Sequence, residues 1–328
     1  MVKIALDAMG GDYAPSEIVK GAVEAVEKKY AEVVLVGIES EIKKELAKYP
    51  AVKGISIKHA PEVIAMDEVP ATAVRKKKNS SMVVAADMVK QKQVQGMVSA
   101  GSTGAQMAAG IMNIGRIKGI NRPAIATLLP TLDGPKLLLD VGSNMDSKPE
   151  NLLQFAHMGS LYVEKLLGKN KPKIGLVNVG AEKTKGNQLT IATYELLEQS
   201  NLNFVGNIEP RDIPKGIVDV MVCDGFVGNC LLKFAEGLAS GFGTLLKREL
   251  TKNVVRKMGA LVLAPGLKDF KKQFDYSEQG GAPLLGINGV SIICHGSSNS
   301  KAICNAIRVA ARSYENNLVE AIQGINDV

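Results

Sequence analysis

Aromatic side chains are scarce in this chain. They make up 4% of its 328 residues, and tryptophan is absent. Proteins that bind single-stranded nucleic acid stack bases on aromatic rings, so this composition provides poorly for that function. The 40 Lys and Arg residues exceed the 33 Asp and Glu residues, but they are spread along the chain rather than gathered in one block. The composition argues against nucleic acid, and the charge of +7 favours a phosphorylated metabolite or an acidic protein as partner.

Cysteines and long apolar runs are also few. The four cysteines lie in the C-terminal third without the close pairing of a zinc site, so we expect reduced thiols. No window supplies the roughly 18 apolar residues that a membrane-spanning helix requires. The first residues already indicate a strand and a turn rather than a signal peptide. We expect a cytoplasmic protein and leave contact with a membrane surface open.

Several cofactor and nucleophile fingerprints are missing. The chain has no G-x-G-x-x-G, which argues against NAD, and no G-x-x-x-x-G-K-[ST], which argues against ATP. It also lacks a G-x-S-x-G elbow and a His and Cys cluster for a metal. We therefore expect chemistry without a cofactor or metal, and without a covalent enzyme intermediate.

What the chain does have is a repeating alternation of strand, polar turn and helix. Strands are predicted from short aliphatic or β-branched runs at Val2–Leu6, Val33–Val36, Ile55–Ile57, Gln95–Val98, Ala124–Leu128, Lys136–Val141, Lys173–Val177, Phe204–Val205, Val218–Val222 and Val290–Cys294. This pattern predicts a doubly wound, mainly parallel α/β sheet. Ligands of such sheets bind at the carboxyl ends of strands.

Two stretches depart from the alternation. Residues 226–275 have a helical pattern with an interruption near Ala264, Pro265 and Gly266, which predicts a projecting helical hairpin. Residues 299–323 predict one long closing helix. We find no repeat or linker and expect a single α/β unit over 1–328, with two lobes as the alternative.

Two glycine-rich loops follow predicted strands in the N-terminal half. Paired glycines bring backbone N–H groups close to an anion, and small hydroxyl residues add further donors. A simple strand-to-helix turn is the alternative for the first loop, where a carboxylate would also repel phosphate. The second loop precedes a helix expected to begin near Gln106. The candidate ligand-binding residues are Asp7, Gly10, Gly11 and Asp12 in the first loop and Ser99, Gly101, Ser102, Thr103 and Gly104 in the second.

Two further loops add polar and charged side chains. In the loop before Pro149, Asn144 and Asp146 either orient a ligand or cap the next helix, and capping is the commoner role. The loop at 178–187 carries a carboxylate and two lysines, and a lysine ammonium suits phosphate and a developing oxyanion. An ordinary charged surface loop is the alternative, and the position at a strand end beside Gly180 and Gly186 argues against it. Its candidate residues are Asn178, Gly180, Glu182, Lys183, Lys185 and Gly186.

The last two loops complete the set. Asn229 is expected in the first turn of a helix, and His295 lies in a strand-end loop, although a lone histidine is more often structural than catalytic. The candidates here are Asp224, Gly225, Asn229, His295, Gly296, Ser297 and Ser298. Since a doubly wound sheet would bring strand-end loops together, we expect all six in one crevice that binds a phosphate group.

These motifs resemble, over essentially the whole chain, those of the bacterial phosphate acyltransferases. The matching segments are DAMGGD at 7–12, SAGSTGA at 99–105, LLDVGSNMD at 138–146, NVGAEKTKGN at 178–187, CDGFVGN at 223–229 and HGSS at 295–298. The resemblance implies a fold similar to the isocitrate and isopropylmalate dehydrogenases and to phosphotransacetylases, used as a homodimer without a nucleotide. It implies transfer of an acyl group from acyl-acyl-carrier-protein to orthophosphate, giving an acyl phosphate for phospholipid synthesis.

The resemblance also suggests roles for residues. Lys185, with Lys183, would hold phosphate, while amides of Gly101–Gly104 and the Asn229 side chain steady phosphate or the oxyanion. His295 or Glu182 would handle the proton of the leaving thiol. Acyl-coenzyme A in place of the carrier protein, and a non-catalytic metabolite-binding scaffold, remain as alternatives.

The predicted hairpin combines basic and apolar residues. Arg248, Lys252, Arg256 and Lys257 would suit an acidic carrier protein. The apolar set Leu261, Val262, Leu263, Pro265 and Leu267 suits either an anionic bilayer or a buried contact. The resemblance favours peripheral membrane association and admits the membrane glycerol-3-phosphate acyltransferase as a further partner.

Overall fold

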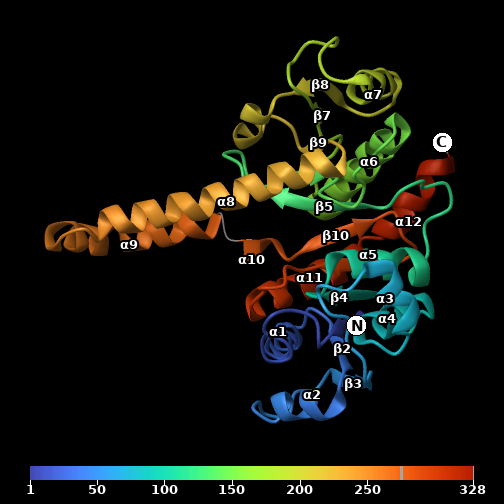
Figure 1. Cartoon of the computed structure of the whole chain (residues 1–328), viewed down its shortest axis with the longest axis vertical. Helices are drawn as coiled ribbons and strands as arrows, with labels where there is room; N and C mark the ends of the chain where they lie inside the picture. Colours follow the sequence, from blue (N-terminus) through green and yellow to red (C-terminus); the bar gives the residue numbers. More distant parts are fainter. Residues whose placement is uncertain (274–275, 328) are drawn as a thin grey trace.

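A computed structural model describes residues 1–273 and 276–327 of the chain (Figure 1). Eleven strands among these residues form one sheet in the order β3-β2-β1-β4-β11-β10-β5-β6-β9-β7-β8. The strands are β1 (Lys3–Asp7), β2 (Glu32–Gly37), β3 (Ile55–His59), β4 (Gly96–Ser99), β5 (Ala124–Leu129), β6 (Lys136–Leu139), β7 (Ile174–Val177), β8 (Phe204–Ile208), β9 (Val220–Val222), β10 (Ala282–Leu285) and β11 (Val290–Ile293).

Helices cover both faces of this sheet. They are α1 (Ser16–Glu27), α2 (Glu39–Leu46), α3 (Pro70–Lys76), α4 (Ser81–Lys90), α5 (Thr103–Ala109), α6 (Pro149–Tyr162), α7 (Gln188–Gln199), α8 (Gly225–Leu250), α9 (Val254–Gln273), α10 (Tyr276–Gln279), α11 (Ser300–Glu315) and α12 (Leu318–Gln323). On β1, Ile4 and Leu6 pack with α1 and α11, while Ala5 between them packs on the opposite face with α4. This alternation, with both faces buried, gives the strand its continuous apolar sequence.

The prediction of a mainly parallel α/β sheet is confirmed, but the middle of the sheet is antiparallel. Strand β10 pairs antiparallel with both β11 and β5, and β5 pairs antiparallel with β6. The sequence analysis missed β10 because Pro283 and the pair Gly280 and Gly281 do not look like a strand. Three antiparallel pairings in a row reverse the direction of the sheet, so β6, β7 and β9 run opposite to β1, β4 and β11.

The helical projection is present, but its turn lies elsewhere than predicted. Helices α8 and α9 extend away from the sheet as a pair in Figure 1. The chain turns at Thr251–Asn253, and α9 continues through Pro265. The predicted interruption near Ala264, Pro265 and Gly266 is therefore wrong. Residues 274 and 275 of the predicted range lie outside the described residues.

Two other boundaries differ from the sequence analysis. Helix α5 begins at Thr103 rather than near Gln106, because the Ser102 side chain accepts a hydrogen bond from Ala105 N (3.4 Å) and caps the helix earlier. The closing helix is broken into α11 and α12 at Asn317, whose φ of 53° is left-handed. Among the helices that the structure describes, none is both long enough and apolar enough to cross a bilayer.

Candidate functional site

The six predicted loops form two groups rather than one. The loops after β1, β4 and β11 follow strands that run in one direction, and those after β6, β7 and β9 follow strands that run the other way. The antiparallel pairings between β11 and β6 were not foreseen, so the expectation that all six strands point in one direction is wrong, whereas the single crevice stays a prediction. We call these the first group and the second group.

In the first group, the loops after β1 and β4 share a buried carboxylate. Asp7 accepts a hydrogen bond of 2.6 Å from the Ser99 hydroxyl, and that hydroxyl accepts one from Gly101 N. Burial raises the pKa of Asp7, although bonds from Ser81 and Ser99 oppose the rise. A Cβ on Gly10 would lie 2.6 Å from Asp7 Oδ2 and 2.7 Å from Gly101 N. Asp7 therefore organises the two glycine loops from inside the protein.

The loop after β11 joins the same group. Asp12 N donates to Gly296 O at 2.8 Å, and the exposed Asp12 carboxylate lies beside Gly296. His295 is exposed, with its Nδ1 2.8 Å from the Ser297 hydroxyl, and Ser298 N donates to the His295 carbonyl. The structure thus brings the loop of Gly11 and Asp12 together with the loop at 295–298.

Asp140 is the centre of the second group. It follows β6, is fully buried, and accepts hydrogen bonds from Ile125 N, from the Ser143 amide and hydroxyl, and from the Asn144 amide and side chain. Burial raises the pKa of Asp140, while the bonds from Ser143 and Asn144 oppose this. Asn144 is thereby fixed in the loop core rather than at a helix cap, and Asp146 is exposed.

The start of α8 packs directly on this loop. Asp224 caps the helix by accepting from Val227 N at 2.9 Å, and Gly225 N donates to Asn144 O at 2.8 Å. A Cβ on Gly228 would lie 1.8 Å from Asp140 O, so only glycine allows the helix this close. Asn229, in the first turns of α8, lies near Gly142. The prediction that Asn229 lies at the start of a helix is confirmed.

The loop after β7 carries the candidate phosphate lysine. Residues 181–187 are exposed, and the Lys185 ammonium has no ion-pair partner among the described residues. Asn178 is buried and donates to the Lys185 carbonyl at 3.0 Å. Gly186 has a φ of 103°, which brings its backbone against Asn178 and Thr190. Lys185 is thus an exposed cation whose backbone is fixed by a hydrogen bond from Asn178.

Lys183 is placed differently. Its ammonium pairs with Glu198 on α7 and lies 5.3 Å over the ring of Tyr194. The pair with Glu198 raises the pKa of Lys183. Of the two lysines that were predicted to hold phosphate, Lys183 already has a carboxylate partner, and Lys185 has none within the described part of the chain.

Two residues that hold these loops by hydrogen bonds escaped the sequence analysis. Asp140 stood inside a recognised motif, and an aspartate directly after an apolar strand was the available signal. Asn207 on β8 is buried and donates its side-chain amide to the Glu182 carbonyl at 2.9 Å. The predicted strand ended at Val205, so no signal identified Asn207.

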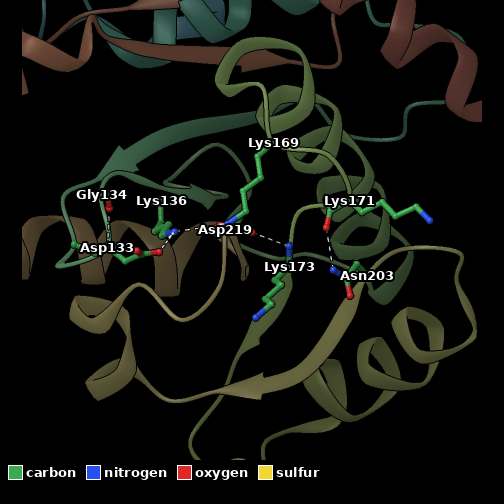
Figure 2. A network of polar contacts seen from close by, with 9 residues as sticks. Asp133, Gly134, Lys136, Lys169, Lys171, Lys173, Asn203 and Asp219 are labelled. Atoms are coloured by element: carbon green, nitrogen blue, oxygen red, sulfur yellow. Dashed lines mark hydrogen bonds and ion pairs between the residues drawn. The ribbon is translucent and has the colours of Figure 1, made fainter.

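The amino ends of β6, β7 and β9 hold a different network (Figure 2). Asp219, buried before β9, receives hydrogen bonds from Lys136 (3.1 Å), Lys169 (2.7 Å) and Lys173 N (2.9 Å). Burial alone would raise the pKa of Asp219, but these bonds lower it below its ordinary value. Asn203 donates to the Lys171 carbonyl nearby at 2.9 Å. Every charge at the centre of this network has a partner within the protein.

The described part of the chain contains no group of three or more His, Cys, Asp and Glu side chains placed to hold a metal ion.

Comparison with known proteins adds a family. A family model described as fatty acid synthesis protein matches residues 2–321. A phosphate acyltransferase from Desulfitobacterium hafniense is 58% identical over 323 residues, which cover 98% of this chain and 97% of that protein. One from Heliobacterium modesticaldum is 57% identical over 324 residues, with 98% and 97% covered.

Solved structures support the fold. A EutD phosphotransacetylase from Staphylococcus aureus superposes with a TM-score of 0.65 at 15% identity, covering 95% of this chain and 94% of that one. A phosphotransacetylase from Streptococcus pyogenes gives 0.62 at 18% identity, with 99% and 94% covered. At such identities, the likeness concerns the arrangement of the elements.

Proposed function

We propose that this chain, which belongs to the fatty acid synthesis protein family, transfers an acyl group from acyl carrier protein to orthophosphate. Its relatives in Desulfitobacterium hafniense and Heliobacterium modesticaldum are phosphate acyltransferases. A phosphate oxygen attacks the thioester carbonyl carbon, and a tetrahedral oxyanion forms. The C–S bond then breaks, the thiol of the carrier leaves, and acyl phosphate is the product. The likeness to phosphotransacetylase structures supports the fold on which this chemistry is proposed.

The observation that carries this proposal is Lys185. It is an exposed lysine on a loop whose backbone is fixed by the buried Asn178, and its ammonium is not committed to a carboxylate of the described residues. A cation held in this way can bind dianionic phosphate and offset its charge as it approaches the carbonyl. Lys183, which pairs with Glu198, has a supporting electrostatic role in this scheme.

The remaining candidate residues divide between the two groups. Asn229, beside Gly142, is proposed to donate to phosphate or to the oxyanion from the second group. The amides of Gly101–Gly104 are proposed to serve the substrate from the first group. Glu182, which shares the loop of Lys185, and His295 are the two candidates for the proton of the leaving thiol.

The test is formation of acyl phosphate from palmitoyl-acyl-carrier-protein by the pure chain, with the product trapped by hydroxylamine. Product that requires both phosphate and the carrier-bound thioester supports the proposal. Product formed only from palmitoyl-coenzyme A would replace the carrier with coenzyme A. If neither thioester reacts, acyl transfer to phosphate is rejected for this chain.

The hairpin of α8 and α9 is the proposed docking surface for the acidic carrier protein. Glu249 pairs with Arg256 at 2.6 Å and lies 3.9 Å from Lys252, so part of the predicted basic patch is neutralised. Arg248 and Lys257 carry the attraction to the carrier in this proposal. Weakened transfer from the carrier, with unchanged transfer from coenzyme A, is expected for Arg248→Glu.

The apolar residues of α9 in the hairpin are proposed to contact the membrane. Leu261 and Val262 on α9 are 75% and 81% exposed, and Leu263 and Pro265 are also exposed, whereas Leu267 is half-buried. Apolar side chains among basic residues suit the surface of an anionic bilayer. Leu261→Glu is expected to reduce sedimentation with anionic vesicles. Leu132→Glu, at an 89% exposed leucine between β5 and β6, is the matched control. Equal binding by both variants would contradict the proposal.

Helix α8 also supports the proposal of a homodimer. An exposed apolar stripe with a spacing of three or four residues runs along it through Phe234, Leu238, Phe242 and Leu245, and the exposed Phe226 lies eight residues before Phe234. Exposed stripes of this kind mark interaction surfaces. Light scattering should show a dimer that Phe242→Glu dissociates, and a monomeric parent chain would reject the dimer.

A further inference from the structure

The loop that carries Lys185 is exposed from 181 to 187, yet it is held at two carbonyl groups. Asn178, directly after β7, donates its side-chain amide to the Lys185 carbonyl at 3.0 Å. Asn207, near the end of β8, donates its side-chain amide to the Glu182 carbonyl at 2.9 Å. Two buried asparagines on neighbouring strands therefore set the position of an otherwise solvent-exposed loop.

The Glu182 carbonyl is the junction of this arrangement. It accepts the side-chain amide of Asn207 and also the backbone N–H of Lys185, at 3.1 Å. A displacement of Glu182 would therefore move the backbone of Lys185. Asn207 controls the turn through which the lysine is presented, although its own contact is to Glu182.

An irregularity in β8 directs Asn207 to this place. Ile174 pairs with Phe204, but Leu176 pairs with Asn207, so β8 contains one residue more than β7 across this stretch. Gly206 provides the extra residue with a φ of 102°. A one-residue shift turns a strand side chain to the other face of the sheet, and bulges of this kind re-aim side chains next to functional sites.

The hydrogen bonds of the Asn207 side chain favour a role in positioning the loop over a role in stabilising the fold. The side-chain nitrogen of Asn207 donates to the Glu182 carbonyl. Its side-chain oxygen, Oδ1, is buried and has no hydrogen-bond partner among the described residues. A buried acceptor without a partner destabilises a fold. An apolar residue of similar size would remove this oxygen, and the carbonyl of Glu182, an exposed residue that still accepts from Lys185 N, would keep one hydrogen bond.

We propose that Asn207 is a positioning residue for phosphate binding, which acts by holding the Glu182 carbonyl and thereby the backbone of Lys185. The inference rests on the proposed function, in which Lys185 binds phosphate. It predicts that a change at Asn207 weakens phosphate binding without a comparable loss of stability.

A control residue lies directly before the same strand. Asn203, just before β8, also donates its side-chain amide to a carbonyl that flanks β7, that of Lys171, at 2.9 Å (Figure 2). Asn207→Leu should raise the KM for phosphate roughly three- to tenfold, with kcat and the KM for the thioester within about twofold. Asn203→Leu should leave all three constants unchanged. Asn207→Asp keeps the shape of the side chain but loses the N–H donor, so it should raise the KM for phosphate as Asn207→Leu does. It serves as the test variant if Asn207→Leu does not fold.

Lys185→Ala is measured in parallel so that the two claims can fail separately. If Lys185→Ala leaves the KM for phosphate unchanged, the proposed function of Lys185 is wrong. If Lys185→Ala raises this KM but Asn207→Leu and Asn207→Asp do not, Asn207 is not a positioning residue. An equal rise in the Asn203 variant would also overturn the inference, because the effect would then belong to β8 as a whole.

Discussion

The two ends of strands β6, β7 and β9 differ in how their polar groups are satisfied. At the amino ends, Asp219 accepts hydrogen bonds from Lys136, Lys169 and the backbone of Lys173, and Asp133 is a second carboxylate partner of Lys136 (Figure 2). At the carboxyl ends, neutral amides and hydroxyls fix the loops, while the charge of Lys185 is left without a carboxylate partner among the described residues. The comparison indicates that one end stabilises the fold and the other is available to an anionic substrate.

Asp140 and Asp219 sharpen this contrast, because both are buried carboxylates on neighbouring strands. Asp219 has two ammonium partners, and its pKa is lowered, against the effect of burial, by the bonds from Lys169, the Lys173 backbone and Lys136. Asp140 has only neutral donors, and burial raises its pKa. The bonds that Asp140 accepts from Ser143 and Asn144 orient the loop that bears Asn144.

The largest expected effect is at the contact of α8 with the loop of Asp140. Gly228→Ala should lower the free energy of unfolding by about 4 kcal/mol, since the new Cβ would lie 1.8 Å from a backbone oxygen. Thermal unfolding measures this. Gly241→Ala in the same helix is the control, because a Cβ there meets nothing within 4 Å. A tolerated Gly228→Ala would mean that the carboxyl end is less tightly packed than described.

Asp219→Asn should come next and should affect stability rather than activity. Removal of this charge leaves the buried Lys136 with only the exposed Asp133 as partner, at 2.7 Å, and we expect a loss of about 3 kcal/mol. Chemical denaturation at neutral pH measures the loss. A fall in kcat at a temperature where the variant is folded would contradict the assignment of this end to stability.

The ion pair of Asp219 with Lys136 also predicts how the stability of the fold depends on pH. The pKa of Asp219 is lower in the folded than in the unfolded chain, so its ionised form stabilises the fold above the unfolded value of about 3.9. That contribution is lost as the pH falls through the folded value. The difference in stability between the parent chain and Asp219→Asn should therefore be complete at pH 7 and shrink below about pH 4. A difference that stays constant down to pH 3 would show that the charge of Asp219 is not responsible.

Asp140→Asn should have the smallest effect on stability but a clear effect on activity. Asparagine keeps the shape but replaces one acceptor oxygen by a donor, which cannot accept from Asn144 or Ser143. We expect kcat/KM to fall roughly 30-fold with a change in unfolding free energy of about 1 kcal/mol. Steady-state kinetics beside thermal unfolding separate the two quantities. Unchanged kinetics would remove Asp140 from the account of the site.

The sequence predicted the strand-end loops and their chemistry because these depend on local patterns. An apolar run followed by glycine and small polar residues was enough to locate Asp7, Ser99, Asn144 and Lys185. It did not predict the two groups, because strand direction depends on β10, whose Pro283 and preceding glycines hide it. Asn207 was missed for a related reason, since a bulge at Gly206 sets its direction and bulges have no firm local signal.

The most direct test compares two lysines at opposite ends of β7. Lys169 precedes the strand and pairs with Asp219 at 2.7 Å, whereas Lys185 follows it without a carboxylate partner among the described residues. The phosphate KM and the thermal midpoint are measured for Lys169→Ala and Lys185→Ala. We predict a rise of roughly 100-fold in KM with an unchanged midpoint for Lys185→Ala, and a lower midpoint with an unchanged KM for Lys169→Ala. Unchanged phosphate binding in Lys185→Ala would contradict the account.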